Sequence, residues 1–218
     1  MDLAQLVNEF IQGLHNTGWP EYVAVISGIG SVWFSRIENI WVYPVGLVST
    51  ILYTWLSLKG NLFGEASVNI YYTIMSVYGW VLWARTDTHR QHLVTIARSS
   101  GREWTSQVIF FAGCYGVIFF GLSYLKQMFA PQAIPWADAL ASASAFTGMW
   151  LMAKKKVESW YWWIVTNLSS IPLYFVKGYV FSSVFYLVLL VMAFWGLAEW
   201  KKRAVQTEVT PLPDTHGV

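Results

Sequence analysis

The sequence predicts an all-α membrane protein with seven transmembrane helices, arranged as two similar triplets joined by a single helix (a 3+1+3 parallel repeat). Three observations lead to this fold class. Of the 218 residues, 56% are hydrophobic and only 12% are charged, whereas about 25% of a soluble domain is charged. The apolar residues fall into seven runs, each close to the roughly 20 residues that a spanning helix needs. The first three runs also resemble the last three.

The seven predicted helices are separated by charged residues or by turns. In chain order they cover residues 19–36, 39–58, 63–84, 105–125, 136–153, 159–177 and 179–200. The breaks between and after them contain Arg36 to Glu38, Lys59 to Asn61, Arg85, Lys126 to Pro131, Lys154 to Lys156, Lys177 with Gly178, and Lys201 to Arg203. Because charges are costly in hydrocarbon, each break predicts that the chain has reached a membrane surface.

The two ends of the chain complete this division. Residues 1–18 contain no Lys or Arg, so they lack the basic start of a signal peptide, and their apolar spacing predicts a short amphipathic helix on the membrane surface. Residues 204–218 are polar and contain two prolines, which predicts a disordered tail. The predicted parts are a surface helix (1–18), a first triplet (19–84), a cytoplasmic loop (85–104), a connecting helix (105–126), a second triplet (136–203) and a cytoplasmic tail (204–218).

The basic residues predict which side of the membrane each end faces. Of the 14 Lys and Arg residues, only Lys59, Lys126 and Lys177 fall on the side opposite the C-terminus. Cytoplasmic loops carry the excess of basic residues in membrane proteins. The sequence therefore predicts a multi-pass membrane protein, with its N-terminus outside and its C-terminus in the cytoplasm.

The repeat is seen in matched positions of Glu, Gly and Trp. Each triplet has a Glu before a Trp at the start of its second helix, a Lys-Gly turn after that helix, and a Gly four residues before a Trp at the end of its third. In the first triplet these are Glu38, Trp41, Lys59, Gly60, Gly79 and Trp83. In the second they are Glu158, Trp160, Lys177, Gly178, Gly196 and Trp200. Parallel repeats of this kind occur in small transporters whose site lies between the repeats.

Residues that perform chemistry in other proteins are missing from the predicted spans. All four His lie outside them, no acidic residue lies mid-span, and Cys114 is the only cysteine. This pattern predicts no metal, no cofactor and no catalytic site. The net charge of +2 predicts no nucleic-acid partner. With no buried charge to couple transport to an ion gradient, the sequence favours a passive path for an uncharged or delocalised-charge solute.

Two predicted helices each carry a stripe of neutral polar and aromatic residues, because steps of three or four residues stay on one helix face. One stripe is Asn69, Tyr72, Ser76, Trp80 and Trp83; the other is Trp160, Trp163, Asn167, Ser170 and Tyr174. Amides offer donors and an acceptor, and Trp faces attract flat rings and delocalised cations. The stripes therefore predict a site for a flat ring joined to a sugar, with Trp41 and Gln107 as further candidates. An interfacial aromatic belt and helix–helix contacts are the alternative explanations.

The same residues form motifs that resemble one transporter family. They are Asn69-x-x-Tyr72, Tyr78-Gly79-Trp80-x-x-Trp83, Trp136-x-Asp138, Val157-Glu158-x-Trp160-x-x-Trp163-x-x-x-Asn167, Tyr174-x-x-Lys177-Gly178 and Tyr186. Over about residues 19–203 the chain is similar to the PnuC family of bacterial vitamin transporters. The resemblance implies a fold that is SWEET-like in outline, a homotrimer, and facilitated diffusion of nicotinamide riboside, which a cytoplasmic kinase then traps by phosphorylation. It also implies that both stripes bind substrate.

Several other functions remain compatible with the sequence. Sister branches of the family carry thiamine or riboflavin, which also have flat rings. A sugar facilitator with the same repeat is a further alternative, as is a receptor or a lipid-modifying enzyme. The loop 85–104 is short for a receptor surface, and the only paired His residues, His89 and His92, have no third ligand nearby in the sequence.

Overall fold

The computed structural model describes residues 7–8, 11–13, 15, 18–60, 63–86, 93–126 and 133–209. Within these ranges the chain is α-helical apart from connecting segments and an isolated bridge between Ala97 and Lys156. The helices are α2 (Trp19–Arg36), α3 (Val42–Lys59), α4 (Phe63–Ala84), α5 (Gly101–Leu125), α6 (Pro135–Ala153), α7 (Ser159–Val176) and α8 (Val180–Val209). The all-α prediction is confirmed.

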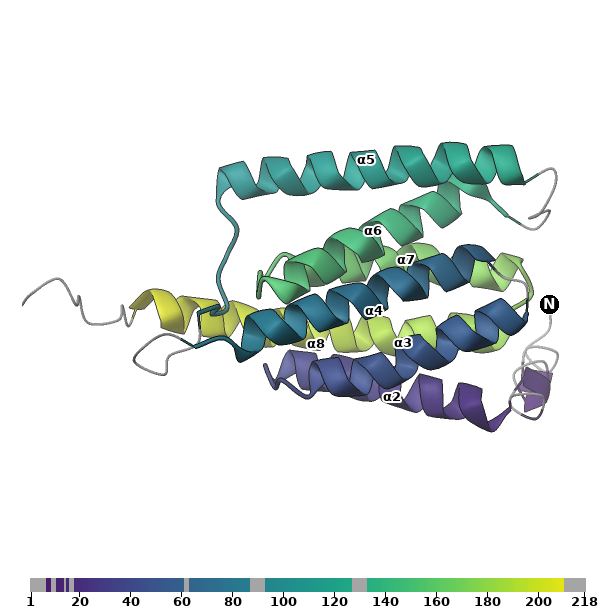
Figure 1. Cartoon of the computed structure of the whole chain (residues 1–218), viewed down its shortest axis with the longest axis horizontal. Coiled ribbons are helices and arrows are strands. Elements are labelled where there is room, and N and C mark those ends of the chain that lie inside the picture. The colour runs from purple at the N-terminus through teal and green to yellow at the C-terminus, as the bar shows by residue number, and fades with distance from the viewer. Residues whose placement is uncertain are drawn as a thin grey trace, which may run out of the picture.

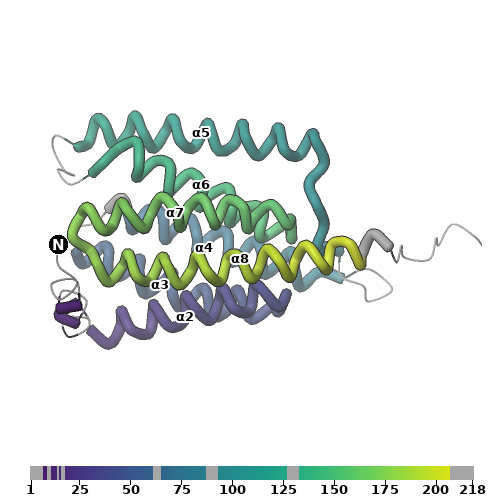
Figure 2. Tube along the Cα trace, turned by 180° about the vertical axis from the view of Figure 1, so that it is seen from behind, coloured from purple at the N-terminus to yellow at the C-terminus, as the bar shows by residue number. Residues whose placement is uncertain are grey.

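Consecutive helices pack side by side in two groups of three. Helix α3 packs against both α2 and α4, and α7 packs against both α6 and α8 (Figure 1). The two groups meet along two seams, where α4 packs on α6 and α2 packs on α8. Among the described helices, the α5 backbone lies close to α6 alone, and both views show it at the edge of the bundle (Figures 1 and 2).

Most helix bounds agree with the predicted spans to within one residue, and the larger differences are at the starts of α3 and α5 and at the end of α8. Helix α5 begins at Gly101 rather than at residue 105 because Ser100 and Glu103 form a capping box, in which each side chain accepts a hydrogen bond from the other's backbone N–H. Helix α8 continues past residue 203 to Val209, so the segment after the last predicted span begins as helix. An ion pair one turn apart, Arg203 Nε to Glu199 Oε1 at 3.1 Å, favours this extension.

Two described helices are long and apolar enough to cross a membrane by composition alone. They are α5 and residues 180–206 of α8. The outer face of α5 exposes large apolar side chains, including Val117, Phe120 and Tyr124, each more than 70% exposed. Such a face suits lipid or another chain better than water. The other five described helices do not meet this criterion, and their crossing of the membrane stays a prediction.

The loop that precedes α5 folds back over the turn between α6 and α7. The Ala97 N–H donates to the carbonyl of Lys155 (3.2 Å), and the Val157 N–H donates to the carbonyl of Ala97 (3.1 Å). The buried Glu158 carboxylate accepts hydrogen bonds from the N–H (2.9 Å) and the hydroxyl (2.6 Å) of Ser99. These bonds fix the first turn of α7.

The two ends of the chain are described only in part. The predicted surface helix, residues 1–18, is helical at residues 7–8, 11–13 and 15, and its other residues apart from Gly18 lie outside the described ranges. The predicted tail lies outside them from residue 210 onward.

Candidate binding cavity

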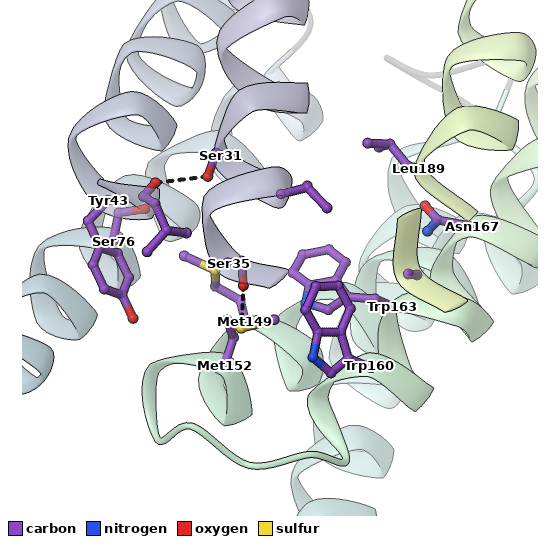
Figure 3. Close-up of a pocket in the computed structure, with 13 residues that line it drawn as sticks. Ser31, Ser35, Tyr43, Ser76, Met149, Met152, Trp160, Trp163, Asn167 and Leu189 are labelled. Carbon is purple, nitrogen blue, oxygen red and sulfur yellow. Dashed lines mark hydrogen bonds between the residues drawn. The ribbon is translucent and has the colours of Figure 1, made fainter. Parts of the chain in front are cut away.

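A cavity of about 110 Å³ lies between the two helix triplets. All six helices of the triplets contribute to its wall, and α5 does not. Figure 3 shows the lining side chains. The lining residues are Ser31, Val32, Ser35, Val42, Tyr43, Ser76, Met149, Met152, Trp160, Trp163, Asn167, Leu189 and Ala193. None of these described lining residues is charged. The wall is therefore mainly apolar and aromatic, with one amide and several hydroxyls.

Two buried aromatic rings, Tyr43 and Trp160, line the cavity from opposite triplets, each only 1% exposed. Each ring packs against a glycine of the third helix of its own triplet. A Cβ added at Gly79 would lie 2.5 Å from the Tyr43 ring, and one added at Gly196 would overlap the Trp160 ring. Only glycine lets the helices approach so closely here.

A second pair of rings packs edge-on against the first. The Tyr43 and Trp83 ring centroids are 5.2 Å apart at 87°, and those of Trp160 and Trp200 are 5.6 Å apart at 87°. Trp83 and Trp200 in turn lie 6.3 Å apart across the boundary between the triplets. The cavity therefore rests on a fixed aromatic layer, because edge-to-face packing is a favoured arrangement.

The polar groups of the cavity fall into two kinds. Ser31 donates its hydroxyl hydrogen to the carbonyl of Val42 (2.8 Å), and Ser35 donates to Met152 Sδ (2.8 Å), so these hydroxyls have partners. Asn167 and Ser76 are each 3% exposed, and neither side chain has a hydrogen-bond partner within the described part of the chain. The Asn167 amide lies on the inner side of α7 (Figure 3). A buried amide without a protein partner is costly, so a bound molecule or water is expected to meet it.

The structure brings three predicted site residues, Trp160, Trp163 and Asn167, to this cavity. A fourth, Tyr72, lies beside it, with its ring centroid 6.2 Å from that of Trp163. Trp83 lies in the aromatic layer behind Tyr43, where its indole N–H donates to the carbonyl of Ala153 (3.1 Å). These five residues form one continuous group around or beneath the cavity.

The other five predicted residues lie away from the cavity lining. Trp41 and Trp80 are 58% and 40% exposed. Asn69 donates to the carbonyl of Glu65 one turn earlier on its own helix (2.9 Å).

Gln107 is fully buried and joins α5 to its neighbours, donating to the Ser99 hydroxyl (2.8 Å) and accepting from the Trp162 indole N–H (3.2 Å). Tyr174 is near the far end of α7, stacked 5.1 Å from Tyr186. Each of these two side chains already has protein partners, which explains its position apart from the cavity.

Tyr43 lines the cavity but is not among the residues predicted from the sequence, which include Trp41. Trp41 is the N-cap residue of α3, and Glu158 is the N-cap residue of α7, so these two positions are equivalent in the two triplets. An alignment of Glu38 with Glu158 is therefore out of register. The signal that identifies Tyr43 is its spacing, since it precedes Gly79 by the same distance as Trp160 precedes Gly196.

An apolar helical bundle with an uncharged aromatic cavity between two triplets has the features of a small-molecule transporter. The family model described as nicotinamide mononucleotide transporter matches residues 18–202. The chain belongs to this family of membrane-embedded vitamin transporters, which confirms the predicted relation to PnuC and shows that it is a transporter rather than an enzyme.

Different relatives carry different vitamins. The riboflavin/roseoflavin transporter RibM of Streptomyces davaonensis is 26% identical over 187 residues, which cover 85% of this chain and 86% of RibM. The nicotinamide riboside transporter PnuC of Escherichia coli is 22% identical over 208 residues, covering 86% and 87%. The crystal structure of a vitamin B3 transporter PnuC has a TM-score of 0.70 and 24% identity, covering 94% of this chain and 90% of that one, and shows a shared fold.

Proposed function

We propose that the protein imports nicotinamide riboside by facilitated diffusion and binds it in the cavity between the triplets. The observation that carries this proposal is the Asn167 amide, which lies in an aromatic cavity without a protein partner. Nicotinamide riboside combines a flat cationic ring with a carboxamide and ribose hydroxyls. Trp160 and Trp163 offer ring faces for the pyridinium, an attraction of about 2 kcal/mol when desolvated. Asn167 and Ser76 offer hydrogen bonds to the carboxamide or the ribose.

A repeat with two similar halves supports a transport cycle in which one half moves relative to the other, with the cavity between them. A shift of 117 residues, the separation of Glu38 from Lys155, carries the bounds of α3 onto those of α7 and the start of α4 onto the start of α8. The same shift pairs residues of the cavity wall from opposite halves. These pairs are Val32 with Met149, Ser35 with Met152, Tyr43 with Trp160, and Ser76 with Ala193. We infer a 3+1+3 parallel repeat of seven spans, with the cavity on its pseudo-twofold axis.

The direction and setting of transport rest on sequence and family resemblance. The excess of basic residues near the C-terminal side supports an inner-membrane protein with its N-terminus outside. The resemblance supports a homotrimer embedded in lipid, with α5 offering an apolar outer face. An uncharged cavity supports passive transport, and phosphorylation by a cytoplasmic nicotinamide riboside kinase would then prevent the vitamin from leaving.

Riboflavin is the second candidate, because RibM covers most of this chain at a higher identity than the Escherichia coli PnuC. The cavity size favours the smaller vitamin. At about 110 Å³ it is below the roughly 300 Å³ of typical ligand pockets, so binding has to widen it. A single pyridinium ring requires less widening than the three fused rings of a flavin. Met149 and Met152 in the wall are unbranched side chains that adapt readily to such a change.

Calorimetric titration of the purified protein with nicotinamide riboside, riboflavin and thiamine tests the substrate. We expect nicotinamide riboside to bind and Asn167→Ala to reduce its affinity by at least about tenfold, because the ligand's polar groups lose their partner. Stronger binding of riboflavin or thiamine would leave the cavity in place and reject the choice of vitamin. No binding of any of the three, with a sugar bound instead, would reject the vitamin site as a whole.

Proteoliposomes that contain the protein without a kinase or an ion gradient test the passive mechanism. We expect radiolabelled nicotinamide riboside to reach the same concentration inside and outside, and to accumulate only when the kinase and ATP are enclosed. The matched control is liposomes without protein. Accumulation above the external concentration in the absence of kinase would contradict facilitated diffusion.

A further inference from the structure

One end of the bundle, formed by the turns at residues 37–41 and 154–158, is closed by an ion pair between the two triplets. Glu38 Oε1 lies 2.7 Å from Lys155 Nζ, and the Lys155 side chain is only 4% exposed. The Lys155 ammonium also lies 4.5 Å from the centre of the Trp83 ring. The other Glu38 oxygen lies 3.3 Å from Arg203 of α8. We call this end of the bundle the turn end.

Hydrogen bonds beside the ion pair also cross between the triplets. The Trp83 indole N–H donates to the carbonyl of Ala153, the Trp200 indole N–H donates to the carbonyl of Ser35 (3.0 Å), and the Ser35 hydroxyl donates to Met152. Ser35 and Met152 also line the cavity. The layer of contacts that joins the triplets at the turn end is therefore also the wall that separates the cavity from that end.

The backbone at the ion pair is held in an uncommon conformation. Glu38 has φ of 60° and Lys155 has φ of 51°, and they are the non-glycine residues with positive φ in the described part of the chain. Such conformations persist where surrounding contacts impose them, and they often occur at switch regions. The two residues also occupy equivalent places in the two turns, so a rocking motion of one half against the other would pull them apart directly.

We propose that Glu38 and Lys155 are the gate of the turn end, and that the cavity opens to that side when their ion pair breaks. This rests on the proposed transport function, although it does not depend on which vitamin is carried. The ion pair positions the halves in the closed arrangement, and the contact of Glu38 with Arg203 also joins the triplets, because Arg203 belongs to the same half as Lys155. Loss of either partner leaves a charge that is poorly solvated in the closed state, which favours the open state.

Accessibility of a cysteine in the cavity tests the gate without any substrate. Ser76→Cys is introduced into a Cys114→Ala background and labelled with a membrane-impermeant thiol reagent from each side, in inside-out and right-side-out vesicles. We expect Glu38→Gln and Lys155→Met each to speed labelling from the turn-end side by about tenfold or more. The double variant should label no faster than the faster single variant, because the two residues act as one unit.

The matched control is the ion pair at the other end of the bundle. Lys177 Nζ lies 2.6 Å from Asp138 Oδ1, with side-chain exposures of 15% and 20%, but this pair joins residues of one triplet. Asp138→Asn should therefore leave labelling unchanged, and Lys155→Arg, which keeps the charge, should label as slowly as the parent. Equal acceleration in Asp138→Asn, or none in Glu38→Gln and Lys155→Met, would overturn the gate. If the gate variants label faster while no vitamin binds, the gate stands and the proposed cargo fails.

Discussion

Replacing Trp163 with leucine is expected to weaken nicotinamide riboside binding by about 30-fold, which corresponds to about 2 kcal/mol. Leucine keeps apolar volume in the cavity wall but removes the ring face that attracts a cationic ring. The Trp163 ring is held in place by contact with Gly148, whose added Cβ would lie 3.2 Å from it, and by Tyr72. Calorimetry measures the effect, and Trp163→Phe, which retains a smaller ring, should lose less affinity.

The controls for this prediction are the two predicted tryptophans that the structure places at the surface. Trp41→Leu and Trp80→Leu should change affinity by less than about twofold, because those rings are 58% and 40% exposed and do not line the cavity. A loss of binding in Trp80→Leu equal to that in Trp163→Leu would mean that the site follows the stripe in the sequence rather than the cavity.

Replacing Gly196 with alanine is expected to destabilise the protein by about 1–3 kcal/mol and to weaken vitamin binding as well. The added Cβ would overlap the Trp160 ring. The ring is rigid and 1% exposed, so it has no free direction in which to move. Either α8 moves away from α7 or Trp160 shifts into the cavity. Thermal unfolding in detergent, followed by near-ultraviolet circular dichroism, measures the loss of stability.

A glycine on the edge helix provides the matched control. An added Cβ at Gly121 of α5 would meet nothing within 4 Å. Gly121→Ala should therefore keep or raise stability, since alanine is the better helix former by about 1 kcal/mol. Gly79→Ala, which would press on Tyr43, should behave like Gly196→Ala. Equal melting temperatures for all three variants would contradict the close packing of the aromatic layer.

The sequence predicted the helices well because charges and turns mark where apolar runs stop. The predicted span 63–84 coincides with α4, and 19–36 coincides with α2. The later start of the predicted fourth span had a different cause. The spacing of Ser100 and Glu103 fits a capping box, but polar capping residues lower the hydropathy that marks the predicted spans.

The predicted stripe on α7 faces the cavity, whereas only part of the predicted stripe on α4 does. Trp160, Trp163 and Asn167 share a face of α7, and that face meets the cavity. On α4 the same periodicity places Ser76 in the cavity wall while Trp80 is exposed. Helix α4 packs against both α3 and α6, so only part of its polar face is left to line the cavity. Periodicity identifies a face but does not identify its neighbour.

Long-range contacts explain the remaining differences. Gln107 is bound by Ser99 because the loop before α5 returns over the turn at the start of α7, and no local pattern predicts that return. Tyr43 was hidden by an alignment of the repeats that matched two glutamates. Acidic residues near helix ends are common enough to coincide by chance, whereas the fit of a ring against a glycine is a packing requirement that both halves share.

A structure determined with nicotinamide riboside bound tests the central claim most directly. We expect the pyridinium ring to lie against Trp160 or Trp163, within hydrogen-bond reach of the Asn167 amide, in a cavity wider than the present 110 Å³. A vitamin bound elsewhere, for example at the stacked Tyr174 and Tyr186 near the far end of the bundle, with the cavity unchanged, would contradict it.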